Sequence, residues 1–210
     1  MASKFRLRII FRPIIIILAK LLIKIGVSPN LATCIMFTFS VFSMIALIIF
    51  SNLLLFSLFV FLVGIFDGID GAIARLSGRT TFFGAFFDSI MDRASEFVIF
   101  FSLLAHYRYY LLWNIIGLPI IIIVSFIASI MISYIRAKAE NVYNGDFDVG
   151  LMARSERLFY IVISMIIVYF YGFIGEILFV FMLLVIVTAI FRFYKLNGLI
   201  KDFENQISNQ

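Results

Sequence analysis

Long apolar runs, separated by short polar turns, most strongly limit what this chain can fold into. Of its 210 residues, 64% are hydrophobic and only 14% are charged. A water-soluble domain has about 45–50% apolar and about 25% charged residues. This chain therefore has too few polar side chains to cover its own surface in water, and we predict an all-α membrane protein with one domain.

Six of the apolar runs, about 16 to 29 residues long, are candidates to cross a bilayer as helices, since about 20 residues are needed. We predict spans near residues 31–50, 52–75, 81–105, 111–139, 157–172 and 175–194. Residues 1–27 combine basic side chains with a shorter apolar run, which predicts an amphipathic juxtamembrane helix that Pro13 bends or restarts. The six-helix domain then covers residues 28–196, and residues 197–210 form a polar, irregular cytoplasmic tail.

The basic residues indicate how the protein is oriented. If the N-terminus is cytoplasmic, every Lys and Arg except Arg108 lies on or near the cytoplasmic side, as the positive-inside rule requires. We therefore expect an integral protein of the cell membrane with both termini, the 140–156 loop and the active site on that side. The net charge of +5 is explained by this topology, so we expect no nucleic-acid partner. The opposite side receives aromatic residues typical of a membrane interface, namely Tyr107, Tyr109, Tyr110 and Trp113.

Single copies of cysteine and histidine exclude several kinds of site. Cys34 has no second cysteine to pair with, and His106 has no second histidine. A disulfide and a metal centre built from several histidines are therefore excluded within this chain. Cys34 lies in an apolar run, where we expect a small core residue.

Four aspartates lie near the cytoplasmic ends of two consecutive apolar segments. At about 100° per residue, Asp67 and Asp70 share one helix face, while Asp88 and Asp92 continue a stripe that begins at Gly84. A tight turn at 76–80 makes the two helices antiparallel neighbours, so the two acidic faces can meet.

A divalent cation would offset the free-energy cost of placing these four carboxylates together in the membrane. One Asp at mid-membrane costs about 2.5–3.5 kcal/mol, and four facing each other also repel. Carboxylate oxygens without thiol or imidazole favour Mg²⁺ or Mn²⁺, and phosphoryl-transfer sites often hold two such ions. Small residues beside the aspartates permit either close helix contact or room for a phosphate-bearing ligand; they are Gly68, Gly71, Ala74 and Gly84.

The pattern D-x2-D-G-x2-A-R-x8-G-x3-D-x3-D, which starts at Asp67, resembles the signature of the CDP-alcohol phosphatidyltransferase family at every fixed position. The resemblance implies a homodimeric membrane enzyme that moves a lipid phosphatidyl group from a CDP-lipid to a small alcohol and releases CMP. It implies that Asp67, Asp70 and Asp88 bind metal, and that Asp92 is a further ligand or the general base. It places the CDP moiety against Gly71, Ala74, Arg75, Thr81 and Gly84.

A second basic region predicts the acceptor. Its candidate phosphate-binding residues are Ser133, Arg136, Lys138, Arg154, Arg157 and Arg192. The run S-Y-I-R-A-K-A-E followed by E-R-L is similar to the phosphatidylinositol-phosphate synthase and archaetidylinositol-phosphate synthase branch, in which the acceptor is an inositol phosphate. On a regular helix Lys138 points about 200° away from Arg136, so Lys138 is the weaker assignment. The alternative interpretation of this region is charge at the membrane edge.

Three questions remain open at this point. A glycerol 3-phosphate acceptor would need a similar basic pocket and would make the protein a phosphatidylglycerophosphate synthase. The donor lipid can be based on diacylglycerol or on archaeol. A cation transporter also buries carboxylates, but it would spread them through the membrane depth on discontinuous helices.

Overall fold

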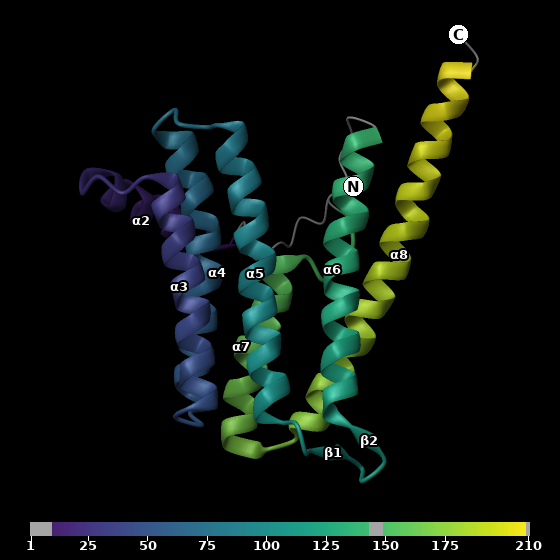
Figure 1. Ribbon diagram of the computed structural model, residues 1–210. Helices are drawn as coiled ribbons and strands as arrows, with labels where there is room; N and C mark the ends of the chain where they lie inside the picture. Colours follow the sequence, from purple (N-terminus) through teal and green to yellow (C-terminus); the bar gives the residue numbers. More distant parts are fainter. Residues whose placement is uncertain (1–9, 143–148, 209–210) are drawn as a thin grey trace.

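The computed structural model describes residues 10–142 and 149–208, and within these ranges the chain forms seven helices and one short hairpin (Figure 1). The start of the basic N-terminal segment, with Lys4, Arg6 and Arg8, lies outside the described residues, as does 143–148 of the 140–156 loop. The helices are α2 (Arg12–Lys24), α3 (Pro29–Ile48), α4 (Leu53–Leu76), α5 (Phe82–His106), α6 (Leu118–Val142), α7 (Arg154–Tyr171) and α8 (Ile174–Ser208).

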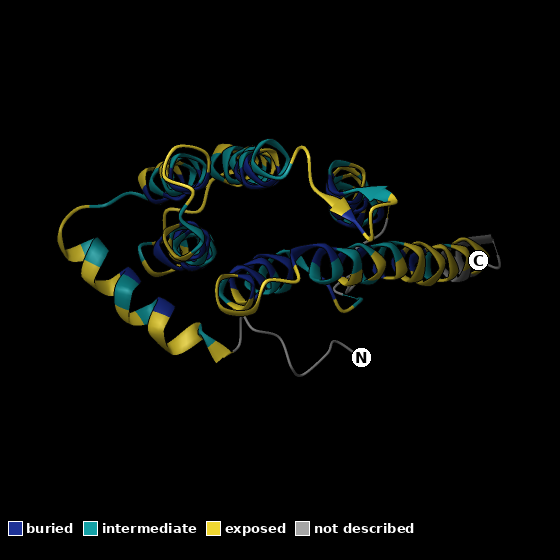
Figure 2. Cartoon of the chain, turned by 90° about the horizontal axis from the view of Figure 1, so that it is seen from below, coloured by how far each residue is buried: buried dark blue, intermediate teal, exposed yellow. Residues whose placement is uncertain are grey.

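The six long helices α3 to α8 run up and down beside one another, and α2 lies across them (Figures 1 and 2). α3 packs against α4 and α5, α6 against α8, and α7 and α2 against α4. Large apolar side chains such as Phe97, Ile127 and Val187 point outward and are more than half exposed. An outer surface of this kind suits lipid rather than water, in agreement with an integral membrane protein.

Within residues 10–142 and 149–208, four helices have the length and apolar composition to cross a membrane: α3, α4, α6 and residues Ile174–Lys201 of α8. α5 and α7 carry more charge, since α5 contains Asp88, Asp92 and Glu96 and α7 begins with Arg154 and Arg157. These charged residues line the cavity described below. The residues of the site therefore make α5 and α7 less hydrophobic than the other four long helices.

Polar capping residues set several helix boundaries close to the predicted ones. The side chains of Ser28, Asn52 and Thr81 each accept a hydrogen bond from a backbone N–H in the first turn of α3, α4 and α5. Gly78 in the connection from α4 to α5 has φ +66°, which glycine adopts without strain. Pro13 lies in the first turn of α2, where its missing N–H breaks no helical hydrogen bond.

The structure differs from the predicted span at 111–139. The first residues of that range form a hairpin, in which β1 (Leu111–Leu112) pairs antiparallel with β2 (Ile116–Gly117), and α6 starts only after it. Trp113 and Asn114 have φ of 51° and 57°, which reverses the chain direction as in a tight hairpin turn. The apolar composition of this stretch does not distinguish such a hairpin from the first turns of a helix.

The predicted irregular tail from residue 197 is instead part of α8, which continues to Ser208. Leu196 is buried against Ala139 of α6, so the pair α6 and α8 stays in contact beyond the apolar part of the helices. This tertiary contact supports helix in a stretch that the polar composition alone did not predict.

Candidate active site

A polar cavity of about 420 Å³ lies between α4, α5, α6, α7 and α8. The sequence predicted α4 and α5 to be direct neighbours, but they barely touch, because α3 packs against both of them. The acidic faces of α4 and α5 therefore meet across a cavity rather than in a packed interface, and this leaves room for a ligand between them.

Three of the four predicted metal-binding carboxylates come together at this cavity. Asp67 of α4 and Asp88 and Asp92 of α5 each offer an oxygen, and these oxygens lie within 4.8 Å of one another. All three side chains are partly buried, and the donor set consists of oxygen alone. Hard divalent cations such as Mg²⁺ and Mn²⁺ prefer ligands of this kind, so the three residues fit a metal ion.

Asp70 lines the same cavity but lies outside this group of three. Its side chain is buried, and its Oδ2 accepts a hydrogen bond of 2.9 Å from the hydroxyl of Thr33 on α3. The sequence analysis missed Thr33, because a threonine in an apolar helix commonly bonds its own backbone and carries no sign of a distant partner.

Arg154, predicted to bind the acceptor phosphate, lies among the carboxylates. Its guanidinium forms ion pairs with both Asp67 and Asp92 and also donates to the backbone carbonyl of Asp92 at 3.3 Å. The sequence placed this arginine in the acceptor pocket and the aspartates in the metal site. In the structure the predicted acceptor pocket and the predicted metal site are parts of one cavity, and Arg154 lies between its acidic and basic walls.

Arg157 has a structural partner where the sequence predicted an acceptor phosphate. Its Nε and Nη2 donate to the two carboxylate oxygens of Glu96 at 2.8 and 3.0 Å, and its Nη1 donates to the carbonyl of Met152 at 3.1 Å. Both charged side chains are buried. Glu96 was missed, although it extends the stripe of Asp88 and Asp92 by four residues, and a buried glutamate in an apolar helix requires a partner.

The remaining predicted acceptor residues divide into two groups. Ser133, Arg136 and Arg192 line the cavity. Lys138 does not, and its ammonium lies over the ring of Tyr134, 5.7 Å from the centroid, in agreement with its predicted direction on the helix.

Arg192 is buried, and backbone carbonyls accept its hydrogen bonds. It donates to the carbonyl of Val149 through Nε and Nη2, at 2.8 and 2.6 Å, and to the carbonyl of Ile132 through Nη1 at 2.9 Å. The guanidinium thus ties α8 to α6 and to the chain before α7. Arg136 is more exposed and pairs with Glu140 one helical turn away, at 2.7 Å.

Of the five residues predicted to contact the CDP moiety, two line the cavity and three do not. Gly71 and Arg75 line the cavity. A Cβ atom at Gly71 would lie only 3.2 Å from Nη1 of Arg75, so the glycine leaves room for the guanidinium. Ala74, Thr81 and Gly84 do not line the cavity, and Thr81 instead caps α5 through a 3.0 Å hydrogen bond from the Gly84 N–H.

Besides Glu96, two polar residues of α5, Ser89 and Arg93, line the cavity although the sequence analysis did not select them. Arg93 follows Asp92 directly and donates to both the backbone carbonyl and the hydroxyl of Ser89. Its position beside an aspartate that was selected is the signal that could have identified it.

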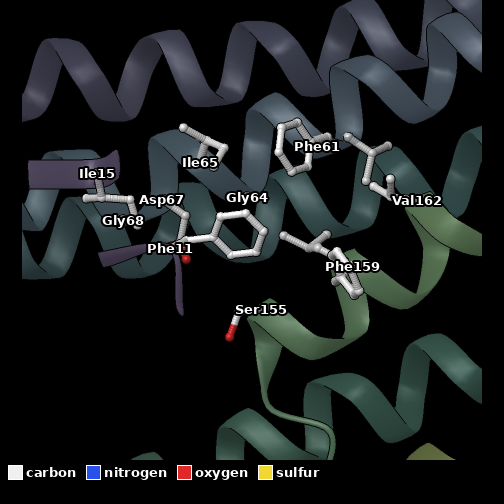
Figure 3. Close-up of a pocket in the computed structure, with 12 residues that line it drawn as sticks. Phe11, Ile15, Phe61, Gly64, Ile65, Asp67, Gly68, Ser155, Phe159 and Val162 are labelled. Atoms are coloured by element: carbon white, nitrogen blue, oxygen red, sulfur yellow. The ribbon is translucent and has the colours of Figure 1, made fainter. Parts of the chain in front are cut away.

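A small apolar groove of about 50 Å³ adjoins the polar cavity between α2, α4 and α7. Phe11, Phe61 and Phe159 are among its walls, and Asp67 and Ser155 contribute the oxygen atoms drawn in Figure 3. Asp67 and Ser155 line both spaces, so the groove begins at the acidic wall of the cavity.

Residues 26–192 match the sequence profile of the CDP-alcohol phosphatidyltransferases. The chain belongs to the CDP-alcohol phosphatidyltransferase family. The archaetidylinositol phosphate synthase of Pyrococcus horikoshii is 30% identical over 147 residues, which are 70% of this chain and 73% of that relative. The phosphatidylinositol phosphate synthase of Mycobacterium tuberculosis is 33% identical over 144 residues, which are 67% of this chain but only 64% of the relative.

Solved structures of the mycobacterial enzyme have the same fold as this phosphatidyltransferase. The structure with CDP-DAG bound superposes with a TM-score of 0.74 at 26% identity, covering 88% of this chain and 94% of the other. A second structure of that enzyme, in complex with manganese and citrate, gives a TM-score of 0.73 at 25% identity, covering 87% and 88%. Family and fold agree with the carboxylate cluster, which can bind a metal ion of the kind seen in that relative.

Proposed function

We propose that the enzyme transfers a phosphatidyl or archaetidyl group from a CDP-lipid to an inositol phosphate and releases CMP. One observation carries this proposal: a cavity with three clustered carboxylates on one wall receives at least one arginine from each of five helices. These arginines are Arg75, Arg93, Arg136, Arg154, Arg157 and Arg192. A CDP-lipid alone brings one diphosphate, whereas an acceptor with its own phosphate adds a second anion to be bound.

The apolar groove supports a lipid donor. A donor whose diphosphate contacts the carboxylate cluster can direct the first part of an acyl or isoprenoid chain past Asp67, where the groove between α2, α4 and α7 begins. Chains of both kinds are apolar, so CDP-diacylglycerol and CDP-archaeol both suit these walls. The groove is narrow at the close approach of α2 to α4, where a Cβ on Gly68 would lie 2.6 Å from the tip of Ile15.

The residues that would hold one or two Mg²⁺ or Mn²⁺ ions are Asp67, Asp70, Asp88 and Asp92. When bound, such ions neutralise negative charge that develops on the diphosphate as CMP leaves. Arg75, which lies over Gly71 in the cavity wall, is positioned to contact the same diphosphate.

The chain itself supplies the base and the orientation of the acceptor. Asp92 accepts the proton of the attacking hydroxyl. The hydroxyl oxygen bonds to the phosphorus next to the lipid, and the bond from that phosphorus to the CMP oxygen breaks, so CMP takes the bonding electrons. A single displacement of this kind needs no covalent intermediate on the protein.

The acceptor phosphate is proposed to lie on the basic side of the cavity, near Ser133, Arg136, Arg154 and Arg192. Arg154 is the central residue of this proposal. Its ion pair with Asp92 supports the role, because a group held by this guanidinium would lie beside the proposed base. Arg157 and Lys138 have less support, since Arg157 is already held by Glu96 and a backbone carbonyl and Lys138 lies outside the cavity.

We further propose six membrane spans, α3 to α8, with α2 as the amphipathic juxtamembrane helix. The parallel arrangement of α5 and α7 with the four apolar helices supports this count, and the crosswise position of α2 supports its surface location (Figure 1). The basic residues support a cytoplasmic site and cytoplasmic termini in the cell membrane. Family resemblance is the support for a homodimer surrounded by membrane lipids.

A competition assay tests the acceptor. Purified enzyme in detergent receives one CDP-lipid together with inositol 1-phosphate and glycerol 3-phosphate at equal concentration, and the lipid product is identified by mass spectrometry. We expect the inositol-phosphate lipid and CMP, with each of the two CDP-lipids tested in turn. Formation of the glycerophosphate lipid alone would leave the transferase chemistry intact but replace the acceptor. Absence of CMP in every reaction would overturn the function.

A further inference from the structure

The hydrogen bond from Thr33 to Asp70 connects two helices at a buried point beside the carboxylate cluster. Thr33 belongs to α3 and Asp70 to α4, 37 positions later in the chain, and the Oγ1 to Oδ2 distance is 2.9 Å. Thr33 is 2% exposed and Asp70 is 4% exposed. Both side chains are almost fully shielded from bulk water, so the contact limits reorientation of the carboxylate.

The same hydroxyl lies 3.2 Å from the carbonyl of Pro29, which offers a purely local alternative. A hydroxyl has one proton to donate, and a carboxylate at the shorter distance is the stronger acceptor. Other hydroxyls of α3 behave differently: Thr38 donates to the carbonyl of Cys34 at 2.9 Å, within its own helix. Thr33 therefore acts between helices, and Thr38 shows what a local threonine bond looks like in the same helix.

Asp70 is placed to act together with the cluster. Its carboxylate lines the same cavity and interacts electrostatically with Asp67 and Asp88. An aspartate on a helix can turn about its side-chain bonds. The Thr33 hydroxyl limits that rotation from α3 by engaging Oδ2, while the adjacent Gly71 N–H donates to Oδ1. Partners of this kind orient metal-binding residues in many proteins, and removing them typically lowers metal affinity about 10- to 100-fold.

We propose that Thr33 is a positioning residue of the metal site, which holds Asp70 in the orientation that a divalent cation requires. This inference rests on the proposed role of Asp70 as a metal ligand. It also gives α3 a part in the site, since α3 packs against both α4 and α5 and carries the hydroxyl that contacts Asp70.

The test compares Mn²⁺ binding by the purified full chain with that of Thr33→Val, Thr33→Ser and the control Thr38→Val. Free Mn²⁺ is measured by electron paramagnetic resonance well below the unfolding temperature, and thermal unfolding is recorded in chelator. We expect Thr33→Val to raise the Mn²⁺ Kd about 10- to 100-fold. We expect Thr33→Ser, which keeps the hydroxyl, and Thr38→Val to stay within about twofold of the wild type.

Unchanged Mn²⁺ affinity in Thr33→Val would overturn the proposal, and so would a Thr33→Ser variant as weak as Thr33→Val. If Thr33→Val does not fold, Thr33→Ala, which needs less space, takes its place with the same expected result. In an Asp70→Asn background, removal of the Thr33 hydroxyl should change the affinity no further. Failure of the wild-type chain to bind Mn²⁺ would overturn the metal site itself, an outcome distinct from a site that binds Mn²⁺ without needing Thr33.

Discussion

The buried ion pair between Glu96 and Arg157 allows a quantitative prediction. Glu96→Leu removes the partner of a guanidinium that is 1% exposed and leaves its charge in the interior. Breaking a buried pair by deleting one partner costs about 3–5 kcal/mol of folding free energy. For a chain of this size we expect the unfolding temperature to fall by about 6–20 °C.

The double variant Glu96→Leu/Arg157→Met should be more stable than either single variant. Apolar replacement of both partners removes the two desolvation costs together, and such exchanges are often neutral or stabilising. The losses of folding free energy in the two single variants should therefore not add up in the double variant. We expect a coupling energy of several kcal/mol, at or somewhat above the upper end of values seen for residues in direct contact.

Thermal unfolding in detergent, followed by intrinsic fluorescence, measures all variants under identical conditions. Arg136→Ala is the control, because Arg136 pairs with Glu140 at the surface with 43% and 47% of the two side chains exposed. A surface pair of this kind contributes about 0–1 kcal/mol. The reasoning is refuted if Glu96→Leu unfolds no earlier than this control, or if the double variant is less stable than both singles.

The same double variant decides whether Arg157 also binds the acceptor. If the fold recovers and the KM for inositol phosphate stays near the wild-type value, the role of Arg157 is structural. A KM that rises about tenfold or more in a stable double variant would support the acceptor-binding role that the sequence predicted.

Four further outcomes are expected. CMP release should stop in EDTA and return with Mg²⁺ or Mn²⁺; full activity in chelator would contradict the metal site. Asp92→Asn should keep nucleotide binding, measured by calorimetry, and lose nearly all turnover. Arg154→Gln should raise the acceptor KM about tenfold or more with little change in the donor KM. In a Cys34→Ser background, a membrane-impermeant thiol reagent added outside cells should label Ile115→Cys and spare Leu151→Cys, and the reverse pattern would invert the topology.

The membrane character and the identity of the acidic residues could be predicted because both depend on local patterns. About 20 apolar residues in a row can be satisfied by a membrane helix whatever surrounds them. Asp67, Asp88 and Asp92 were selected by their spacing, and the structure brings their oxygens together. The same reasoning missed the hairpin at residues 111–117, since two short apolar strands have the composition of a helix start.

The partners of the charged residues depended on the tertiary structure. The sequence shows that Arg154 and Arg157 are three positions apart, but only the packing of α7 against α4, and its position beside α5, directs one to the carboxylate cluster and the other to Glu96. Likewise, only the position of α3 between α4 and α5 brings the Thr33 hydroxyl to Asp70. A helix period tells which face a side chain occupies, whereas the residue it meets is set by how helices distant in the chain pack around it.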